Sequence, residues 1–372
     1  MKPKLCIILP EYSFSTPTHF SYWYDFLRHA SERFELLVIA EKGEHTNAAT
    51  LPYRLTIQRF QWFLLRAAEI KLLLLKARIR GYRNVYVHYS FFAAFLASTI
   101  MRPTGGRVWY WNCGMPWQYQ QGFLRRYFEW FTYHAITYLV TGTENLKKDY
   151  AKQYGIVEEK IKVMPNWIDT KNFYLPVDGS FSGFQKEELR KKLNIPQGAA
   201  VILFVHRLSQ RKGAHYLPEI IDQLRNENVV LLIAGSGPEE KNVKLKIENL
   251  KLKHSVRLLG NIPQSEIGSY FAASDVFIMP SEEEGFPHVM LETMAAGVPF
   301  VAFDVGGTKF IVSEALSHWV VKPGDINTLI ARIRELLTLS PNERAEFAAK
   351  EKIAVERFDI QKVLPIFTKL FI

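Results

Sequence analysis

The chain has 372 residues, of which 48% are hydrophobic, and its formal net charge is +10. This length exceeds one ordinary core and predicts two domains of roughly 170 to 190 residues. Two cysteines, Cys6 and Cys113, are too few for a disulfide framework and indicate free thiols in a reducing cytoplasm. No run of the sequence approaches the ~20 apolar residues that span a bilayer, and we expect a chain that is soluble or peripheral to a membrane.

Short apolar segments alternate with helical patterns in the first half of the chain. The apolar run before Pro10 is a first strand rather than a signal peptide, because it is only five residues long. Further strands are expected within 35–40, 84–90, 107–112 and 135–142. This alternation predicts a parallel, doubly wound sheet.

Positive charge is concentrated in this first half. Residues 1–175 hold 23 Lys and Arg against 13 Asp and Glu, whereas residues 176–372 hold 24 of each kind. Two stretches, 51–83 and 117–131, interleave Arg and Lys with Trp, Phe and Leu. Basic amphipathic helices of this kind are typical of anionic membrane interfaces, although a core helix with a solvated basic face gives the same pattern. Nucleic acid also attracts such charge, but no recognition motif accompanies it, and we do not expect that partner.

The chain then becomes polar and Gly-rich through 176–184, which predicts the connection between two domains. A second set of strands begins at Val201. The predicted organisation is a first domain over 1–170, a second over 171–355, and a final segment over 356–372 whose helix returns to the first domain.

Two predicted strands of the second domain end in loops suited to phosphate. Arg207 and Lys212 follow the strand that begins at Val201; Arg can grip phosphate oxygens as a fork and Lys adds a point charge. Gly235 and Gly237 form a turn after the next strand. Because ligands of open α/β sheets bind outside the carboxyl ends of the strands, these loops are expected to line one crevice. A solvated basic turn is the alternative for Arg207 and Lys212.

A third loop, within 280–297, supplies two carboxylates eight residues apart. Glu284 lies on the loop, and Glu292 falls about one turn inside the following helix. The loop continues through Gly285, Phe286, Pro287 and His288. Free backbone N–H groups at a helix N-terminus stabilise anions. Carboxylates that bind hydroxyls beside amides that bind phosphate suit a sugar nucleotide; a structural loop with solvated acids is the alternative.

Taken in order, residues 206–213, 234–240 and 258–307 resemble the nucleotide-sugar half of retaining glycosyltransferases of the GT-B fold, group 1 (the family 4 type). The resemblance is strong over about 160–325 and weaker elsewhere. It implies two Rossmann-like, doubly wound α/β domains that face each other across a cleft. One departure stands out, because a Gly usually precedes the Arg of the first loop and His206 stands there in this chain.

The resemblance also implies roles for the site residues. Arg207 and Lys212 would bind the donor diphosphate, and Glu292 would hold the ribose hydroxyls. Glu284 would lie near the donor sugar, whose hydroxyls and phosphate would contact the 285–288 backbone. Backbone near 259–262, including Ile262, is expected to contact the base.

Candidates in the first domain, which should bind the acceptor, are weaker. His88 ends a predicted strand and is expected to face the cleft. Asn112 stands where many relatives carry a His or a His-Gly pair. The Gly-Gly loop that the family often has after its first strand is replaced by residues 11–16.

The sequence lacks the Asp-x-Asp pair of the metal-dependent fold and any His/Cys cluster with ligand spacing. We therefore expect metal-independent transfer without a cofactor, in which Arg207, Lys212 and helix dipoles neutralise the leaving diphosphate. Retention leaves two routes open, one with Glu284 as nucleophile and one at the front face with Glu284 only positioning the sugar.

The expected acceptor is a glycan or a lipid-linked or lipopolysaccharide-type molecule at the inner face of the cytoplasmic membrane. Two other functions remain open. One is a catalytically weak sugar-nucleotide-binding subunit that partners an active enzyme. The other is a nucleotide-sugar epimerase, which shares the GT-B fold but lacks this Arg/Lys loop with the Glu pair.

Overall fold

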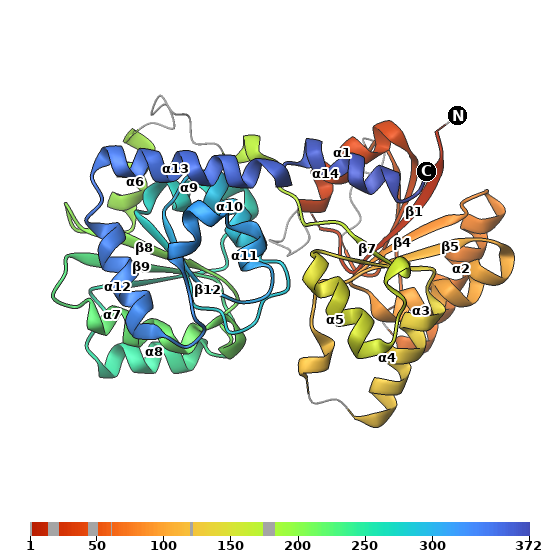
Figure 1. The fold of residues 1–372 in the computed structure, drawn as a ribbon, viewed down its shortest axis with the longest axis horizontal. Coiled ribbons are helices and arrows are strands. Elements are labelled where there is room, and N and C mark those ends of the chain that lie inside the picture. The colour runs from red at the N-terminus through yellow and green to blue at the C-terminus, as the bar shows by residue number, and fades with distance from the viewer. Residues whose placement is uncertain (1, 14–21, 44–50, 61, 120–121, 174–182) are drawn as a thin grey trace. The chain divides into compact units, whose positions relative to one another are not determined.

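Two parallel β-sheets organise the residues that the computed structural model describes, which are 2–13, 22–43, 51–60, 62–119, 122–173 and 183–372. Each sheet belongs to its own unit: Met1–Asn166 joins Ile360–Ile372 in an N-terminal unit, and Trp167–Asp359 forms a C-terminal unit (Figure 1). The sequence places the corresponding boundaries at 170 and 356. Most of the connection predicted at 176–184 lies outside the described residues.

The N-terminal unit is built on seven parallel strands in the order β3-β2-β1-β4-β5-β6-β7. These strands are β1 (Lys4–Leu9), β2 (Glu35–Ala40), β3 (Arg54–Ile57), β4 (Asn84–His88), β5 (Arg107–Trp111), β6 (Tyr138–Thr141) and β7 (Ile161–Val163). The helices are α1 (Tyr22–Arg33), α2 (Phe63–Ile79), α3 (Phe91–Met101), α4 (Phe123–Ala135), α5 (Glu144–Tyr154) and α14 (Ile360–Lys369). Helices α1 and α14 pack together on one face of the sheet, and α2, α3 and α4 cover the other.

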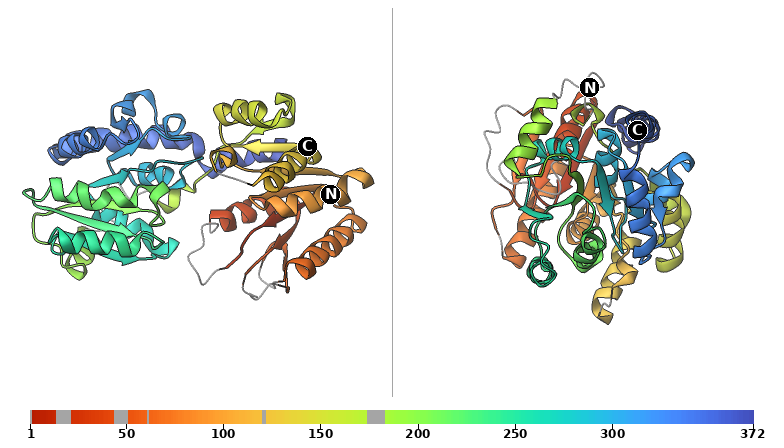
Figure 2. Two further views of the ribbon diagram at one scale, coloured as in Figure 1. Left: turned by 90° about the horizontal axis from the view of Figure 1, so that it is seen from below. Right: turned by 90° about the vertical axis from the view of Figure 1, so that its left-hand side faces the viewer.

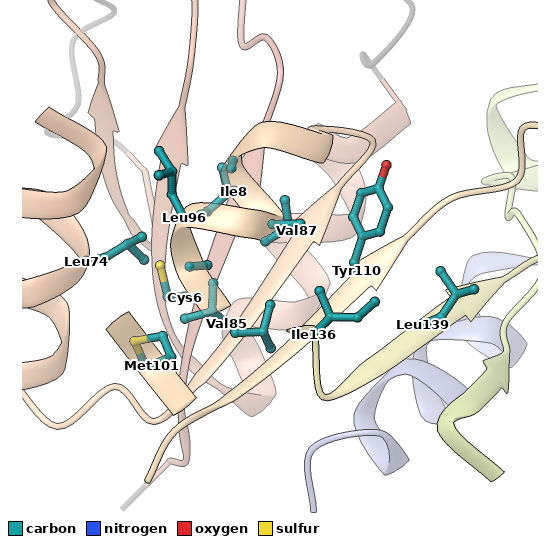
Figure 3. Close-up of a cluster of buried hydrophobic side chains, with 14 of the residues drawn as sticks. Cys6, Ile8, Leu74, Val85, Val87, Leu96, Met101, Tyr110, Ile136 and Leu139 are labelled. Carbon is teal, nitrogen blue, oxygen red and sulfur yellow. The ribbon is translucent and has the colours of Figure 1, made fainter. Parts of the chain in front are cut away.

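The core of this unit lies between the sheet and the layer of α2 and α3 (Figure 3). Strands β1, β2 and β4 are nearly continuous apolar runs because both faces of a parallel sheet are covered. Leu74 from α2 and Leu96 from α3 meet Cys6 and Val85 in this cluster. Both cysteines are buried and free, and burial raises the pKa of the Cys6 thiol to about 12.

The C-terminal unit is built on six parallel strands in the order β10-β9-β8-β11-β12-β13. They are β8 (Ala200–Val205), β9 (Val229–Ala234), β10 (Val256–Gly260), β11 (Val276–Met279), β12 (Phe300–Phe303) and β13 (Val320–Val321). The helices are α6 (Gly183–Lys192), α7 (Leu217–Gln223), α8 (Glu240–Asn249), α9 (Gln264–Ala273), α10 (His288–Ala296), α11 (Thr308–Ile311), α12 (Ile326–Leu337) and α13 (Pro341–Val355).

Helices cover both faces of this second sheet. Helices α7, α8 and α12 lie on one face, and α6, α9, α10 and α13 lie on the other (Figure 1; Figure 2). The chain runs outward from β8 to β10 and then returns to β11, on the other side of β8. The connections that follow β8 and β11 therefore lead to helices on opposite faces of the sheet. This is a topological switch point, where doubly wound sheets bind ligands. The predicted fold, two Rossmann-like doubly wound α/β domains, is confirmed.

Candidate functional site

The loop that follows β8 is folded tightly against the loop that follows β11. The carbonyl oxygen of Arg211 accepts hydrogen bonds from the N–H groups of Glu282 and Glu283, at 2.9 and 3.2 Å. Gly213 adopts φ +70°, and a Cβ there would stand 1.9 Å from the carbonyl oxygen of Pro280. Only glycine fits this position, and the two loops are held together by their backbones.

A buried carboxylate, Glu284, lies between two basic side chains at this junction. Its side chain is 6% exposed; its Oε2 is 2.6 Å from Lys212 Nζ and its Oε1 is 3.2 Å from His206 Nε2. Burial raises the pKa of Glu284, but the Lys212 and His206 charges outweigh burial, and the pKa lies below its ordinary value. Glu284 is therefore ionised at neutral pH. Lys212 has three N–H donors and can hold Glu284 while it also contacts a second anion.

Arg207 follows β8 directly, and its side chain is exposed. Among the described residues, no ion pair engages its guanidinium. This places an open cation at the carboxyl end of the sheet, five residues before Lys212. A guanidinium in this position can bind phosphate oxygens in a bidentate fashion.

The second carboxylate, Glu292, is enclosed in α10. It is 9% exposed, and Gln264 Nε2 of α9 donates a hydrogen bond of 2.7 Å to its Oε1. Burial raises the pKa of Glu292 to about 7, and the hydrogen bond from Gln264 opposes this rise. Glu284 and Glu292 thus have pKa values shifted in opposite directions, which is typical of functional sites.

The loop that follows β12 supports Glu284 through its backbone. Gly307 N–H donates to the carbonyl oxygen of Gly285 at 2.8 Å. Gly306 adopts φ +54°, and a Cβ there would stand 1.8 Å from the carbonyl oxygen of Glu284. Neither glycine was predicted from the sequence to belong to the site. Their position directly after a strand, as a pair, is the signal that could have identified them.

The glycines after β9 have a packing role. Gly235 adopts φ +130°, and a Cβ there would stand 2.0 Å from the carbonyl oxygen of His206. A Cβ on Gly237 would stand 2.3 Å from the carbonyl oxygen of Leu208. Both glycines therefore let the β9 loop approach the loop that carries Arg207. Ile262 is half-buried in the loop after β10.

The segment before α10 offers its backbone rather than its side chains. The Phe286 ring packs against Phe310 and Phe358, with centroid distances of 6.1 and 5.6 Å. Pro287 is buried and precedes the first helical residue, His288. The N-terminus of α10 thus stands beside the loop that carries Glu284, where its N–H groups favour an anion.

The sequence predicted that His88 faces the cleft between the domains; in the structure the His88 side chain has no exposed surface. Its ring stacks on Trp111 at 4.3 Å and contacts Trp23 edge-on at 4.8 Å. Tyr22 Oη lies 3.0 Å from His88 Nε2. His88 ends β4, as predicted, and the aromatic residues around it enclose the ring.

Asn112 is likewise enclosed. Its Nδ2 donates to Tyr133 Oη at 3.1 Å and to Tyr110 Oη at 3.3 Å, and its Oδ1 accepts from Gly114 N–H at 2.8 Å. These contacts satisfy the amide group and hold the turn after β5. Residues 14–16 of the loop that replaces the Gly-Gly pair lie outside the described residues.

No three His, Cys, Asp or Glu side chains within the described ranges are grouped so that they could hold a metal ion. At the switch point the structure brings the Glu284 carboxylate together with the Lys212 cation. Arg207 lies on the same loop as Lys212, and Glu292 lies in the helix that follows Glu284. This arrangement can bind an anion and hydroxyl groups side by side.

Comparison with known families agrees with this geometry. Residues 185–353 match the family model described as glycosyl transferases group 1, and residues 21–172 match the model described as glycosyltransferase family 4. Between them, the two models account for most of the chain. The chain belongs to the group 1 glycosyltransferases.

Two curated relatives illustrate the similarity. The glycosyltransferase MJ1607 of Methanocaldococcus jannaschii, which is uncharacterised, is 29% identical over 55% of this chain and 54% of its own length. TuaC of Bacillus subtilis, a glycosyltransferase named for teichuronic acid biosynthesis, is 32% identical over 43% of this chain and 40% of its own length. The chain thus spans about half the length of the curated relatives it matches.

Among solved structures, Anabaena Alr3699/HepE in complex with UDP-glucose superposes with a TM-score of 0.82. It covers 98% of each chain at 19% sequence identity. At this identity the likeness shows the fold alone.

Proposed function

We propose that this protein is a metal-independent, retaining glycosyltransferase that moves a sugar from a nucleoside diphosphate sugar to a glycan or lipid-linked acceptor. The observation that carries the proposal is the buried Glu284, held 2.6 Å from Lys212 at the switch point of the C-terminal sheet. Arg207 is exposed on the same loop as Lys212, and Glu292 follows Glu284 by eight residues.

The donor diphosphate is bound by positive charge from three sources. Arg207 supplies a guanidinium fork, Lys212 supplies the donors that Glu284 leaves open, and α10 supplies its N-terminal N–H groups. Glu292 accepts hydrogen bonds from the ribose hydroxyls. The UDP-glucose bound in HepE, which shares the fold, supports a nucleotide sugar as the ligand class.

Transfer with retention proceeds at the front face of the sugar. The acceptor hydroxyl oxygen bonds to the anomeric carbon as the bond from that carbon to the diphosphate breaks, and the hydroxyl proton passes to a leaving phosphate oxygen. Arg207 and Lys212 stabilise the charge that develops on the diphosphate. Glu284 positions the sugar in this scheme. Both of its oxygens are engaged, by Lys212 and by His206, which weakens it as a nucleophile.

The biological setting we propose is envelope polysaccharide or lipopolysaccharide synthesis at the inner face of the cytoplasmic membrane. The name of TuaC supports a polysaccharide product. The positive charge of the first half of the chain supports a location beside anionic lipid.

A donor screen tests the proposal. Purified protein is incubated in EDTA with UDP-, GDP-, ADP- and CMP-sugars, and slow donor hydrolysis and thermal stabilisation are measured. Hydrolysis of one donor without metal is the expected result. Binding without hydrolysis would support the partner-subunit function instead, and the absence of binding to every donor would refute the site.

A further inference from the structure

Helix α2 exposes a long apolar stripe. The stripe consists of Leu64, Ala68, Leu72, Leu75 and Ile79. These positions follow the i, i+4, i+8, i+11, i+15 spacing of one helix face. The residues that pack on the core, Ile70, Leu74 and Ala77, lie on the opposite face. Helix α2 therefore has two apolar faces, and the N-terminal unit leaves the face with the stripe uncovered.

Helix α4 repeats this arrangement with aromatic residues. Its exposed hydrophobic side chains are Phe123, Leu124, Tyr127, Trp130 and Phe131. Its buried side chains, Glu129, Thr132 and Tyr133, lie on the opposite side of the helix. Exposed aromatic residues at this density are unusual for a free protein surface and mark an interaction site.

Helix α3 lies between α2 and α4. It contacts both α2 and α4. The Phe63 ring of α2 lies 4.6 Å from Phe92 of α3, and Phe95 of α3 lies 6.0 Å from Phe131 of α4. Helices α2 and α4 thus flank α3 on the same side of the sheet, and we call their exposed apolar side chains together the docking face.

The charges around the docking face are basic. On α2, Lys71 and Arg78 border the apolar stripe on one side and Lys76 borders it on the other. On α4, Arg125 and Arg126 are exposed.

On these two helices the six Lys and Arg residues outnumber the two acidic residues, Glu69 and Glu129. Glu69 accepts hydrogen bonds from the N–H groups of Arg59 and Phe60. Glu129 is buried and pairs with Arg125 and Tyr154. The docking face thus presents apolar side chains within a border of cations.

We propose that the docking face seats the N-terminal unit on an anionic lipid bilayer. Apolar and aromatic side chains enter the interface, while the Lys and Arg heads remain at the level of the phosphates. The cationic border favours anionic lipid over a protein partner, because protein–protein interfaces are depleted in Lys, whereas helices that bind anionic membranes carry Lys and Arg beside their apolar face. No helix within the described residues is long and apolar enough to cross a membrane.

This inference gives the proposed acceptor a lipid-linked character, but it does not rest on the donor site. The docking face and the switch-point loops belong to different units. A protein that binds vesicles without turning over a donor would refute the proposed function alone. A protein that turns over a donor without binding vesicles would refute the docking face alone.

The test is flotation of the full chain with vesicles that mix phosphatidylglycerol with phosphatidylcholine, beside vesicles of phosphatidylcholine only. We expect binding to the anionic vesicles that weakens with added salt. The double variant Leu64→Gln with Leu72→Gln should bind at least about tenfold more weakly, since two apolar side chains leave the interface. Both residues are exposed, at 78% and 51%, and their replacement leaves the core intact.

The matched control replaces two similarly exposed apolar residues of the C-terminal unit, Ile353→Gln with Leu245→Gln, which are 75% and 57% exposed. This control should bind as the unaltered chain does. Equal binding by both double variants would overturn the proposal. So would the absence of vesicle binding, or a self-association in solution that the Leu64 and Leu72 changes abolish, because the face would then pair two copies of the chain.

Discussion

At the scale of single residues, Glu292 combines a buried position with a pKa raised to about 7. The folded state therefore binds this proton more tightly than the unfolded chain does. Ionisation lowers stability progressively as pH rises from about 4.5 to about 7, and the loss is complete above that range. In our account the chain keeps this destabilising carboxylate at position 292 because the ribose hydroxyls of the donor require a carboxylate acceptor.

Glu292→Gln should therefore stabilise the C-terminal unit at alkaline pH while it weakens donor binding. The amide retains the hydrogen bond from Gln264 and carries no charge. We expect the free energy of unfolding in urea to rise by on the order of 1–3 kcal/mol at pH 8, with no gain at pH 4. The exposed Glu346→Gln serves as control and should leave the pH dependence unchanged. A gain of equal size at both pH values would contradict the assigned ionisation.

Substitutions of Lys212 and Glu284 should be coupled in their effects on stability. Donor hydrolysis, in contrast, should not recover when stability does. Lys212→Met leaves the Glu284 carboxylate buried with only His206 as its basic partner and should lower stability by about 3 kcal/mol. Adding Glu284→Gln removes the buried charge and should return stability to within about 1 kcal/mol of the unaltered chain. Donor hydrolysis should stay lost in both variants. Recovery of hydrolysis in the double variant would show that Lys212 serves the fold and not the donor.

The sequence identified side chains that follow strands, but not the contacts between loops. The sequence could predict the positions of Arg207, Lys212 and Glu284 at strand ends, because each residue comes shortly after an apolar run. The hydrogen bond of Gln264 to Glu292 and the pairing of His206 with Glu284 could not be predicted, since the two partners of each contact come from different elements of the chain. His88 shows the same limit, because a strand pattern gives a residue's position and not the aromatic rings that cover it.

At the scale of elements, the site depends on loops that approach within backbone contact. Gly306→Ala should lower stability for two reasons. Alanine disfavours the left-handed backbone at φ +54°, and its Cβ would collide with the Glu284 carbonyl oxygen. Gly324→Ala should lower stability only through the left-handed backbone, since φ is +82° and no atom lies within 4 Å of the added Cβ. We expect the Gly306 variant to be at least about 2 kcal/mol less stable than the Gly324 variant. Equal losses in thermal unfolding would contradict the close approach.

The long elements were predictable and the short edge strands were not. Strands β1, β2, β4 and β5 are apolar runs of five or six residues. Strands β3 and β7 have only four and three residues, at or beside a sheet edge, and are partly exposed. Such segments show no usable periodicity. For α2, the sequence predicted a basic amphipathic helix, whereas the structure shows two opposite apolar faces.

At the scale of the whole molecule, the two ends of the chain meet in the N-terminal unit. Phe367 of α14 lies 4.9 Å from the Phe26 ring and 5.2 Å from the Tyr86 ring. Phe367→Ala should therefore destabilise a unit built almost wholly from the first half of the sequence, by about 3–5 kcal/mol.

Hydrogen exchange in β1 and β4 measures this effect. Faster exchange is expected in the Phe367 variant. The neighbouring Ile366→Ala, which alters a side chain that is 37% exposed, should leave exchange nearly unchanged. Unaltered protection of both strands in the Phe367 variant would show that α14 contributes little to the unit.

The central claim is that the switch-point loops of the C-terminal unit bind the donor diphosphate. Calorimetric titration in EDTA of the donor that the screen identifies tests it, with Arg207→Ala compared to Arg211→Ala. Both residues are exposed arginines of one loop, but Arg211 pairs with Glu283. The account predicts that Arg207→Ala weakens binding by about tenfold to a hundredfold while Arg211→Ala changes it by less than about threefold. Unchanged affinity in the Arg207 variant, or equal losses in both, would contradict it.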